Sequence, residues 1–182
     1  MSVITSKVES ALDKVIYNKG AYVFISKPED YKDANSIMMA YLATKKDMTG
    51  VYVTLNSPYR EITRQMEANR INTNKILFID GTDEAGCNEI NCISLEGNKS
   101  LTALSLAMTQ SCKNPTVQYL FFDSITTLLL YNDIETTQRF MHFLINKIQN
   151  LDIFMILICV EEEKSSKLMP FLSQILDGIV RL

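Results

Sequence analysis

Two aspartates, Asp80 and Asp123, follow short apolar runs, and their setting indicates chemistry more strongly than that of any other residue here. The runs read "ILFID" and "YLFFD", and the second continues into Ser124. Apolar runs of this length predict buried strands, so each carboxylate is expected at the mouth of a strand. In nucleotide-hydrolysing proteins, a carboxylate in that position orients a magnesium ion on the phosphates. The alternative for Asp123 is structural: it caps a turn, with help from Ser124.

The segment after the first predicted strand is where such a fold would bind phosphate, and its composition disfavours that. It reads "SKPEDYKDANS", with no glycine from Ser26 to Ile37. A phosphate cradle needs glycine because successive N–H groups must point inward and the backbone must approach oxygen closely. Its three acidic residues outnumber its two lysines, which repels a triphosphate. The following helix is expected to begin either with a capping box of Ser26 and Glu29 or at Asp30.

The other residues that could carry chemistry are few. His142 is the only histidine and lies in the middle of a predicted helix, so a surface or packed role is expected rather than nucleophilic catalysis. Cys87 and Cys92 lack the spacing of a zinc knuckle and have no second pair, so a hairpin or a chance disulfide is expected instead. No secretory signal precedes the four cysteines, which predicts reduced thiols in a cytoplasmic protein.

Helical and extended patterns alternate along the whole chain. Strands are expected at residues 21–26, 50–55, 75–80, 116–123, 153–160 and 178–182. Helices are expected at residues 6–20, 30–46, 57–70, 100–111, 133–148 and 165–176. The first of these helices begins with a possible capping box of Ser6 and Glu9, and Asp133 is a predicted cap of the fifth. Residues 81–100 form the one irregular insertion, whose two halves are expected to pair as a small hairpin.

Several strands are nearly continuous apolar runs, which indicates a parallel sheet buried on both faces by helices. The 182 residues suffice for one core, and they predict a single doubly wound α/β domain of about six strands over residues 1–182. The net charge of −3 argues against a general polyanion binder. The longest apolar run, residues 153–160, is too short for a bilayer, which takes about 20 residues.

Three stretches carry a family resemblance: "GVYVTLNSPYREITRQMEANRINTNKILFIDGT", "LFFDSITTLLLYNDIETTQRFMHFLINKIQNLDIFMILICVEEE" and "LDGIVRL". Over roughly residues 19–182 they resemble the KaiC-like branch of the RecA-superfamily ATPases. The ordered series matches: a strand ending "DGT", a Walker B strand ending "DSIT", a long helix, a hydrophobic strand and a final "DxIxxL". The resemblance implies a RecA-like, P-loop NTPase type three-layer sandwich with a mostly parallel central sheet. Within that branch, the chain resembles small archaeal proteins that have lost ATPase residues.

Two departures from the family pattern bear on function. Members carry a G-x-x-x-x-G-K-[ST] loop, the Walker A motif, where this chain has "SKPEDYKDANS". They also end the second strand in a pair of glutamates, one of which activates water, where this chain has Asn56 and Ser57. An amide and a hydroxyl cannot act as that general base. The comparison therefore implies no catalytic residue, no cofactor and no metal, only remnants of a nucleotide site. The remnant candidates are Asp123, Ser124, Lys27, Lys32, Ser36, Asn56 and Ser57.

The expected function is that of a pseudo-ATPase, a non-catalytic regulatory or protein-interaction module. One alternative is an atypical ATP-binding KaiC-like ATPase, and another is an ATP-independent nucleic-acid-binding RecA-like protein. The net charge and the lack of a basic-aromatic stripe argue against nucleic acid. The expected partner is another protein or a second copy of the chain, with no membrane involved. Arg60 and Arg64 are candidates to face Glu161 to Glu163 of a neighbour.

Overall fold

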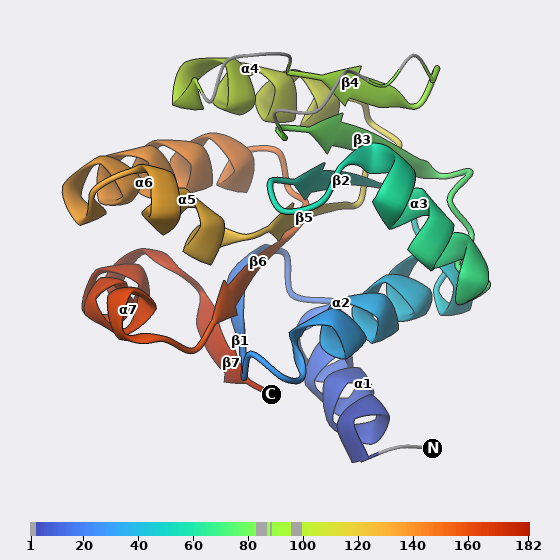
Figure 1. The fold of residues 1–182 in the computed structure, drawn as a ribbon, viewed down its shortest axis with the longest axis horizontal. Coiled ribbons are helices and arrows are strands. Elements are labelled where there is room, and N and C mark those ends of the chain that lie inside the picture. The colour runs from blue at the N-terminus through green and yellow to red at the C-terminus, as the bar shows by residue number, and fades with distance from the viewer. Residues whose placement is uncertain (1–2, 83–86, 88, 96–99) are drawn as a thin grey trace.

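The centre of the molecule is a sheet of seven parallel strands (Figure 1). The structure is a computed structural model that describes residues 3–82, 87, 89–95 and 100–182. The strands are β1 (Gly20–Ser26), β2 (Gly50–Thr54), β3 (Ile76–Asp80), β4 (Cys92–Ser94), β5 (Tyr119–Asp123), β6 (Phe154–Val160) and β7 (Gly178–Arg181). Their spatial order is β4-β3-β2-β5-β6-β1-β7. The six predicted strands are all present, and the insertion supplies the seventh.

Helices cover both faces of the sheet, which gives the three layers that the apolar strands predicted (Figure 1). One face carries α1 (Val3–Val15), α2 (Tyr31–Met39), its π-helical continuation η1 (Ala40–Lys45) and α3 (Tyr59–Ala68). The other face carries α4 (Leu101–Cys112), α5 (Ile125–Tyr131), α6 (Ile134–Gln149) and α7 (Glu163–Ile175). Each face has its own hydrophobic cluster, and the predicted α/β fold class is confirmed. None of the described helices is long and apolar enough to cross a membrane.

The alternation of side chains along β5 decides where its terminal carboxylate points. Tyr119 and Phe121 pack against the helices α1 to α3, whereas Leu120 and Phe122 pack against α4 to α7. Successive side chains of a strand point to opposite faces, so Asp123 shares the face of Tyr119 and Phe121. The end of β5 thereby presents Asp123 to α2 and α3.

The insertion differs from the predicted hairpin. Its described part pairs with β3 in parallel, with Phe78 opposite Cys92 and Asp80 opposite Ser94, so it extends the sheet at one edge. Cys87 and Cys92 are joined by a disulfide with a Cα–Cα distance of 6.0 Å. The disulfide expected as one possibility for this pair is therefore present, and the prediction that all cysteines are reduced is wrong for it. The other two cysteines are free and buried.

Several helix boundaries shift from the predicted ones. The first helix begins at Val3, so Ser6 lies inside it and no capping box forms there. The second begins at Tyr31 with Asp30 in the N-cap position, which is the later of the two predicted starts. The short helix α5 was not predicted at all. By contrast, Asp133 caps α6 as expected, since its side chain accepts a hydrogen bond from the N–H of Thr136.

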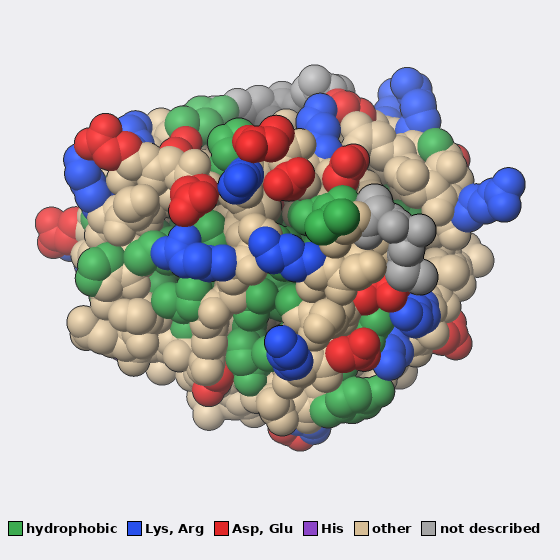
Figure 2. Space-filling view, turned by 90° about the horizontal axis from the view of Figure 1, so that it is seen from below, with side chains coloured by type: hydrophobic (Ala, Val, Ile, Leu, Met, Phe, Trp, Pro, Cys, Tyr) green, Lys and Arg blue, Asp and Glu red, His purple; other side chains and the backbone are tan. Residues whose placement is uncertain are grey.

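The face of the molecule beside β7 is mixed in character. Seen from the side on which α1, β7 and α7 lie, hydrophobic side chains form a patch near the middle (Figure 2). Basic and acidic side chains are interspersed around that patch rather than separated. Such mixed charge differs from the basic stripe typical of nucleic-acid-binding surfaces.

Candidate functional site

Asp123 lies buried at the carboxyl end of β5, with 2% of its surface exposed. Three side chains from other elements donate hydrogen bonds to its carboxylate. Tyr52 donates its hydroxyl at 2.7 Å, Asn56 donates its amide at 3.2 Å, and the hydroxyl of Tyr31 donates to the same oxygen as Asn56. We call these four residues the Asp123 cluster. It joins β2, β5, the loop after β2 and the start of α2.

Burial and hydrogen bonding act on the Asp123 carboxylate in opposite directions. Removal from water disfavours the charged form and raises the pKa of Asp123, whereas the donors from Tyr31, Tyr52 and Asn56 lower it. Burial is the larger effect, so the pKa of Asp123 lies above its ordinary value. Burial and the nearby carboxylate also raise the pKa of both tyrosines, which keeps their hydroxyls available as donors.

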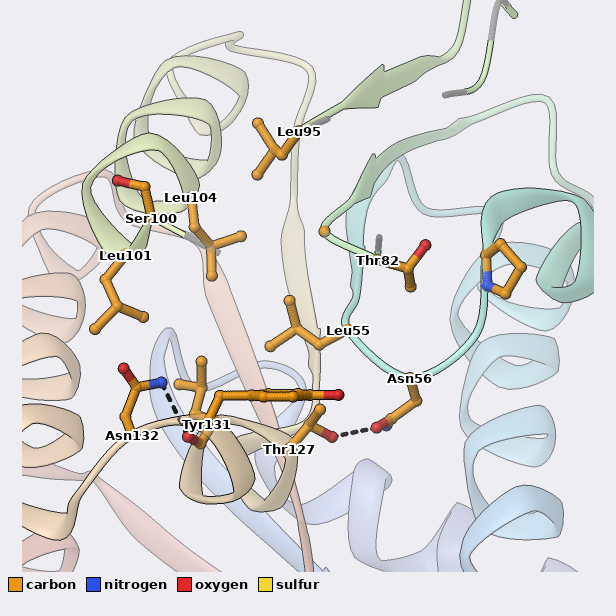
Figure 3. Close-up of a pocket in the computed structure, with 13 residues that line it drawn as sticks. Leu55, Asn56, Thr82, Leu95, Ser100, Leu101, Leu104, Thr127, Tyr131 and Asn132 are labelled. Atoms are coloured by element: carbon orange, nitrogen blue, oxygen red, sulfur yellow. Dashed lines mark hydrogen bonds between the residues drawn. The ribbon is translucent and has the colours of Figure 1, made fainter. Parts of the chain in front are cut away.

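Asn56 connects the cluster to the helix that follows β5. Its amide nitrogen reaches the hydroxyl of Tyr31 at 2.6 Å and that of Ser124 at 3.5 Å. Its amide oxygen accepts a hydrogen bond from the hydroxyl of Thr127, as the dashed line in Figure 3 marks. Both ends of the Asn56 amide are therefore engaged within the protein.

Five of the seven predicted remnant residues line one cavity of about 350 Å³ between α2 and α3. Those residues are Asp123, Asn56, Ser57, Lys32 and Ser36. The remaining two lie elsewhere: Lys27 is exposed in the β1–α2 connection, and Ser124 is buried at the start of α5. The structure thus brings five of these residues together, and their role as remnants of a nucleotide site stays a prediction.

The alternative role for Asp123, as a turn cap helped by Ser124, is wrong. The helix cap at this strand end is Ser124, whose side chain accepts a hydrogen bond from the N–H of Thr127 at 3.3 Å. Asp123 instead accepts from residues 67 to 92 positions away in the chain. Its side chain lies on the face of the sheet that α2 and α3 cover, so its hydrogen-bond partners come from segments distant in the sequence.

Sequence reasoning missed three residues of this site. Tyr31 and Tyr52 supply hydroxyl donors, and Asn35 lines the same cavity with a buried amide oxygen that has no hydrogen-bond partner. Tyr52 offered one signal, since a tyrosine inside a buried strand must place its hydroxyl against a polar group. Tyr31 offered another, because it is an aromatic residue at the start of the helix that follows the first strand.

The β1–α2 connection is a short turn in which the N–H of Asp30 bonds to the carbonyl of Lys27 at 3.1 Å. The described residues with positive φ all lie outside it, at Gly20 and three positions further along the chain. Asp33 adds a negative charge to the first turn of α2. A helix start already flanked by carboxylates satisfies the positive end of the helix dipole with its own anions.

A second cavity, of about 220 Å³, lies on the other side of Asn56 (Figure 3). Leucines from α4, α5 and the loops after β2 and β4 make up much of its wall, and Tyr131 and Thr127 of α5 border it. Because Asn56 lines both cavities, it stands between the hollow beside Asp123 and this second one.

The acidic loop after β6 is engaged within its own chain. Glu161 pairs with Arg181 at 3.1 Å, and Glu163 pairs with Lys167 at 2.8 Å. Glu162 forms a capping box with Ser165 at the start of α7. The prediction that this loop faces Arg60 and Arg64 of a neighbour stays a prediction.

The described ranges assemble no cluster of three His, Cys, Asp or Glu side chains that could hold a metal. His142 is exposed on α6, where its ring lies 3.3 Å from the amide nitrogen of Asn146. This surface position agrees with the sequence-based expectation for His142.

Comparison with known proteins extends the argument from fold to family. No curated protein matches the chain. A solved structure, that of a KaiC-like protein from the hyperthermophilic archaeon Pyrococcus horikoshii OT3, is similar with a TM-score of 0.69 and 16% sequence identity. The similarity covers 90% of this chain and 70% of that one, and at such identity it supports the fold alone. The family model described as "ATPase: KaiC" matches residues 36–182, well over half of the sequence, so the chain belongs to the KaiC ATPase family.

Proposed function

We propose that this chain is a non-catalytic member of the KaiC family, a pseudo-ATPase that acts as a regulatory or protein-interaction module. The observation that carries the proposal is the closed state of the Asp123 cluster. Tyr31, Tyr52 and Asn56 direct their donors at both carboxylate oxygens. The proposed role of the cluster is to hold the sheet and α2 together.

Magnesium is a poor fit to these residues. The ion prefers an octahedral shell of oxygen atoms and binds through one or two carboxylates together with phosphates and waters. Both oxygens of Asp123 already accept hydrogen bonds from protein donors. The positively polarised hydrogens that point at these oxygens would repel a cation. Burial raises the pKa of Asp123, and this also disfavours metal binding because a carboxylate must be deprotonated to bind a metal.

A nucleoside triphosphate is also a poor fit to the β1–α2 connection. The connection has no glycine, and Asp30 and Asp33 stand where phosphate oxygens would approach the helix start. Like charges at that end of a helix repel an anion instead of holding it. The family model begins its match at Ser36, after this connection, which is consistent with a departure from the family at this point.

The position of the family's water-activating glutamate gives a third line of support. Asn56 lies in the loop after β2, and its amide has no basic group with which to take a proton from water. Its oxygen is also occupied by the hydroxyl of Thr127. An ATPase active site would need a carboxylate at this position instead of the amide, and that carboxylate would have to be free of the hydrogen bond from Thr127.

ATP hydrolysis measured with magnesium tests the proposal directly. We expect the wild-type chain to release phosphate no faster than Asp123→Asn. A thermal-shift titration accompanies this assay, because a ligand at ten times its Kd would stabilise the fold by about 1.4 kcal/mol. For a chain of this size that corresponds to a rise in Tm of roughly 3–6 °C. We expect no such rise.

Magnesium-dependent turnover that is lost in Asp123→Asn would overturn the proposal. A rise in Tm that requires both magnesium and ATP, without turnover, would instead favour an atypical ATP-binding protein. Lys32 would then be the first residue to replace, since it lines the cavity beside Asp123.

The proposed partner is another protein or a second copy of this chain. Light scattering at low and high salt measures the second possibility, because screening weakens contacts between exposed charges. A single monomer mass in both conditions would exclude a stable homo-oligomer and leave a different protein as the partner.

A further inference from the structure

A groove of about 860 Å³ runs between α4 and α6 on the sheet face opposite the Asp123 cluster. Every residue that lines it lies in the described part of the chain. One wall is α4 from Leu101 to its cap at Lys113, and the other is α6 from Thr136 to Asn150. None of the contacts of the Asp123 cluster reaches this groove, so its properties need a separate explanation.

The middle of the groove is apolar and open to solvent. Leu106 of α4 is 56% exposed, and Phe143 of α6 is 50% exposed. The helix α4 contains no charged residue over its whole length, although it lies on the surface. A surface helix normally carries charged residues on its solvent face, so this face of α4 is unusually suited to contact with another molecule.

The charges around the groove have a single sign. Lys113, Arg139 and Lys147 line it, and none of the described lining residues is acidic. Lys147 lies over the ring of Phe143, 5.5 Å from its centre, and Arg139 pairs with Glu135 at 2.9 Å just outside the groove. Lys113 and Lys147 therefore keep cationic groups beside the apolar strip.

We propose that this groove binds an acidic amphipathic helix of a partner protein. An amphipathic helix lays its apolar face into a hydrophobic groove and anchors it with residues one turn apart. Leu106 and Phe143 offer the apolar contact, and the lysines at the rim select carboxylates by charge complementarity. The 12 residues of α4 form a wall about 18 Å long, which matches a helix of about three turns.

One end of the groove adjoins the cavity of Figure 3. Leu101 lines both hollows, and Tyr131 borders the cavity on the far side. Residues that continue beyond the bound helix can therefore reach a second, partly polar contact. This continuity favours a peptide segment over a compact small molecule as the occupant.

The inference rests on the protein-interaction half of the proposed function, and a designed peptide tests it. The probe is a fluorescently labelled helix of about three turns, with leucines on one face and glutamates on the other. Fluorescence anisotropy against the full chain should show saturable binding that weakens as salt is added. A peptide with lysines in place of the glutamates should bind at least tenfold more weakly.

Variants of the groove locate the binding. Leu106→Glu and Phe143→Glu place a carboxylate in the apolar strip, and each should weaken binding of the acidic peptide at least tenfold. Lys147→Glu should weaken it severalfold and flatten its dependence on salt. The matched control is Val3→Glu on α1, a residue that is 88% exposed and lies outside the groove, and it should bind like the wild type. Thermal melts of every variant check that the fold is kept.

The inference would be overturned by no binding of the acidic peptide, by equal binding of the basic peptide, or by equal binding to Leu106→Glu. Tighter binding of a single-stranded oligonucleotide that displaces the peptide would do the same and would assign the basic rim to nucleic acid. ATP turnover, assayed in the same preparations, distinguishes the two proposals. ATP turnover would contradict the non-catalytic function but not the peptide-binding groove. Absence of peptide binding would contradict the groove but not the lack of catalysis.

Discussion

Asp80 and Asp123 end two strands of similar sequence, yet their hydrogen-bond partners in the structure differ. Both are buried, with 4% and 2% of their surface exposed. Asp80 accepts hydrogen bonds from the backbone N–H of Tyr59 at 2.8 Å and of Thr82 at 2.9 Å. Asp123 instead accepts hydrogen bonds from side chains, namely two tyrosine hydroxyls and one amide.

The difference teaches how a strand-end carboxylate acquires a role. Asp80 satisfies backbone N–H groups of the turn after β3 and of the start of α3, so its role is structural. Asp123 gathers donors that are far apart in the sequence, and it holds α2 against β2 and β5. A strand followed by aspartate is therefore ambiguous until its partners are known, and the most informative experiments treat the two residues as a pair.

Asp80→Ala should have the largest effect on stability. It leaves the N–H groups of Tyr59 and Thr82 without their acceptor, and charge-assisted hydrogen bonds of this kind are worth about 1.5–3 kcal/mol each. We expect a loss of about 3 kcal/mol, measured by urea unfolding. Asp80→Asn should cost less, because it keeps one acceptor oxygen. A loss below that of Asp123→Ala would reverse the comparison.

Tyr52→Phe should cost about 1.5 kcal/mol, because it removes a donor from the buried Asp123 carboxylate. Tyr119→Phe is the matched control, since Tyr119 is buried on the same sheet face but its hydroxyl has no hydrogen-bond partner. That change should be neutral or slightly stabilising, as the hydroxyl is buried without compensation. Equal losses in the two variants, compared by thermal unfolding, would mean that the Asp123 cluster contributes no more than packing.

Asp123→Asn should change the dependence of stability on pH. Burial raises the pKa of Asp123 in the folded state, so folding favours its protonated form. The stability it contributes is complete below the unfolded pKa of about 3.9 and is lost as pH rises through the folded pKa. The variant cannot ionise at this position, so wild-type stability should fall relative to it by about 1.4 kcal/mol per unit of raised pKa. Urea unfolding between about pH 4 and pH 8 measures this difference. A gap that grows in favour of the wild type with rising pH would show that the anion is the stabilised form.

Thr82→Val should have the smallest effect. The hydroxyl of Thr82 donates to Asp80 at 2.7 Å, but the backbone N–H groups that Asp80 satisfies remain in place. We expect a loss of about 0.5–1 kcal/mol, the net contribution of one ordinary hydrogen bond. Thermal unfolding next to Tyr52→Phe makes the contrast. A loss larger than that of Tyr52→Phe would mean that Asp80, like Asp123, depends on its side-chain donors.

Much of the fold was predictable because burial on both faces leaves a strong local signature. The six apolar segments were found, since a strand covered by helices on both sides needs apolar residues at nearly every position. The edge strand β4 was missed, because three residues with intermediate or exposed side chains carry no such signature. Helix α5 was missed for a related reason: only seven residues separate Ser124 from Asn132, too few for a clear helical period.

The proximity of several candidate residues was predictable from the sequence, but the orientation of their side chains was not. Residues at the carboxyl ends of adjacent parallel strands must lie near one another, which is why Asp123 and Asn56 were grouped with Lys32 and Ser36. The orientation of each side chain was not available from that rule. Ser124, not Asp123, proved to be the cap, because the alternation of β5 turns Asp123 toward α2.

The sequence by itself determined the parallel sheet and the absence of glycine from the β1–α2 connection. It also determined that an amide, Asn56, follows β2, since these features depend only on local composition and order. The tertiary structure alone decided that Asp123 is enclosed by Tyr31, Tyr52 and Asn56. Hydrogen bonds between residues as many as 92 positions apart form only when packing fixes the distance and angle between them. The hydrophobic pattern of the sequence predicts neither this distance nor this angle.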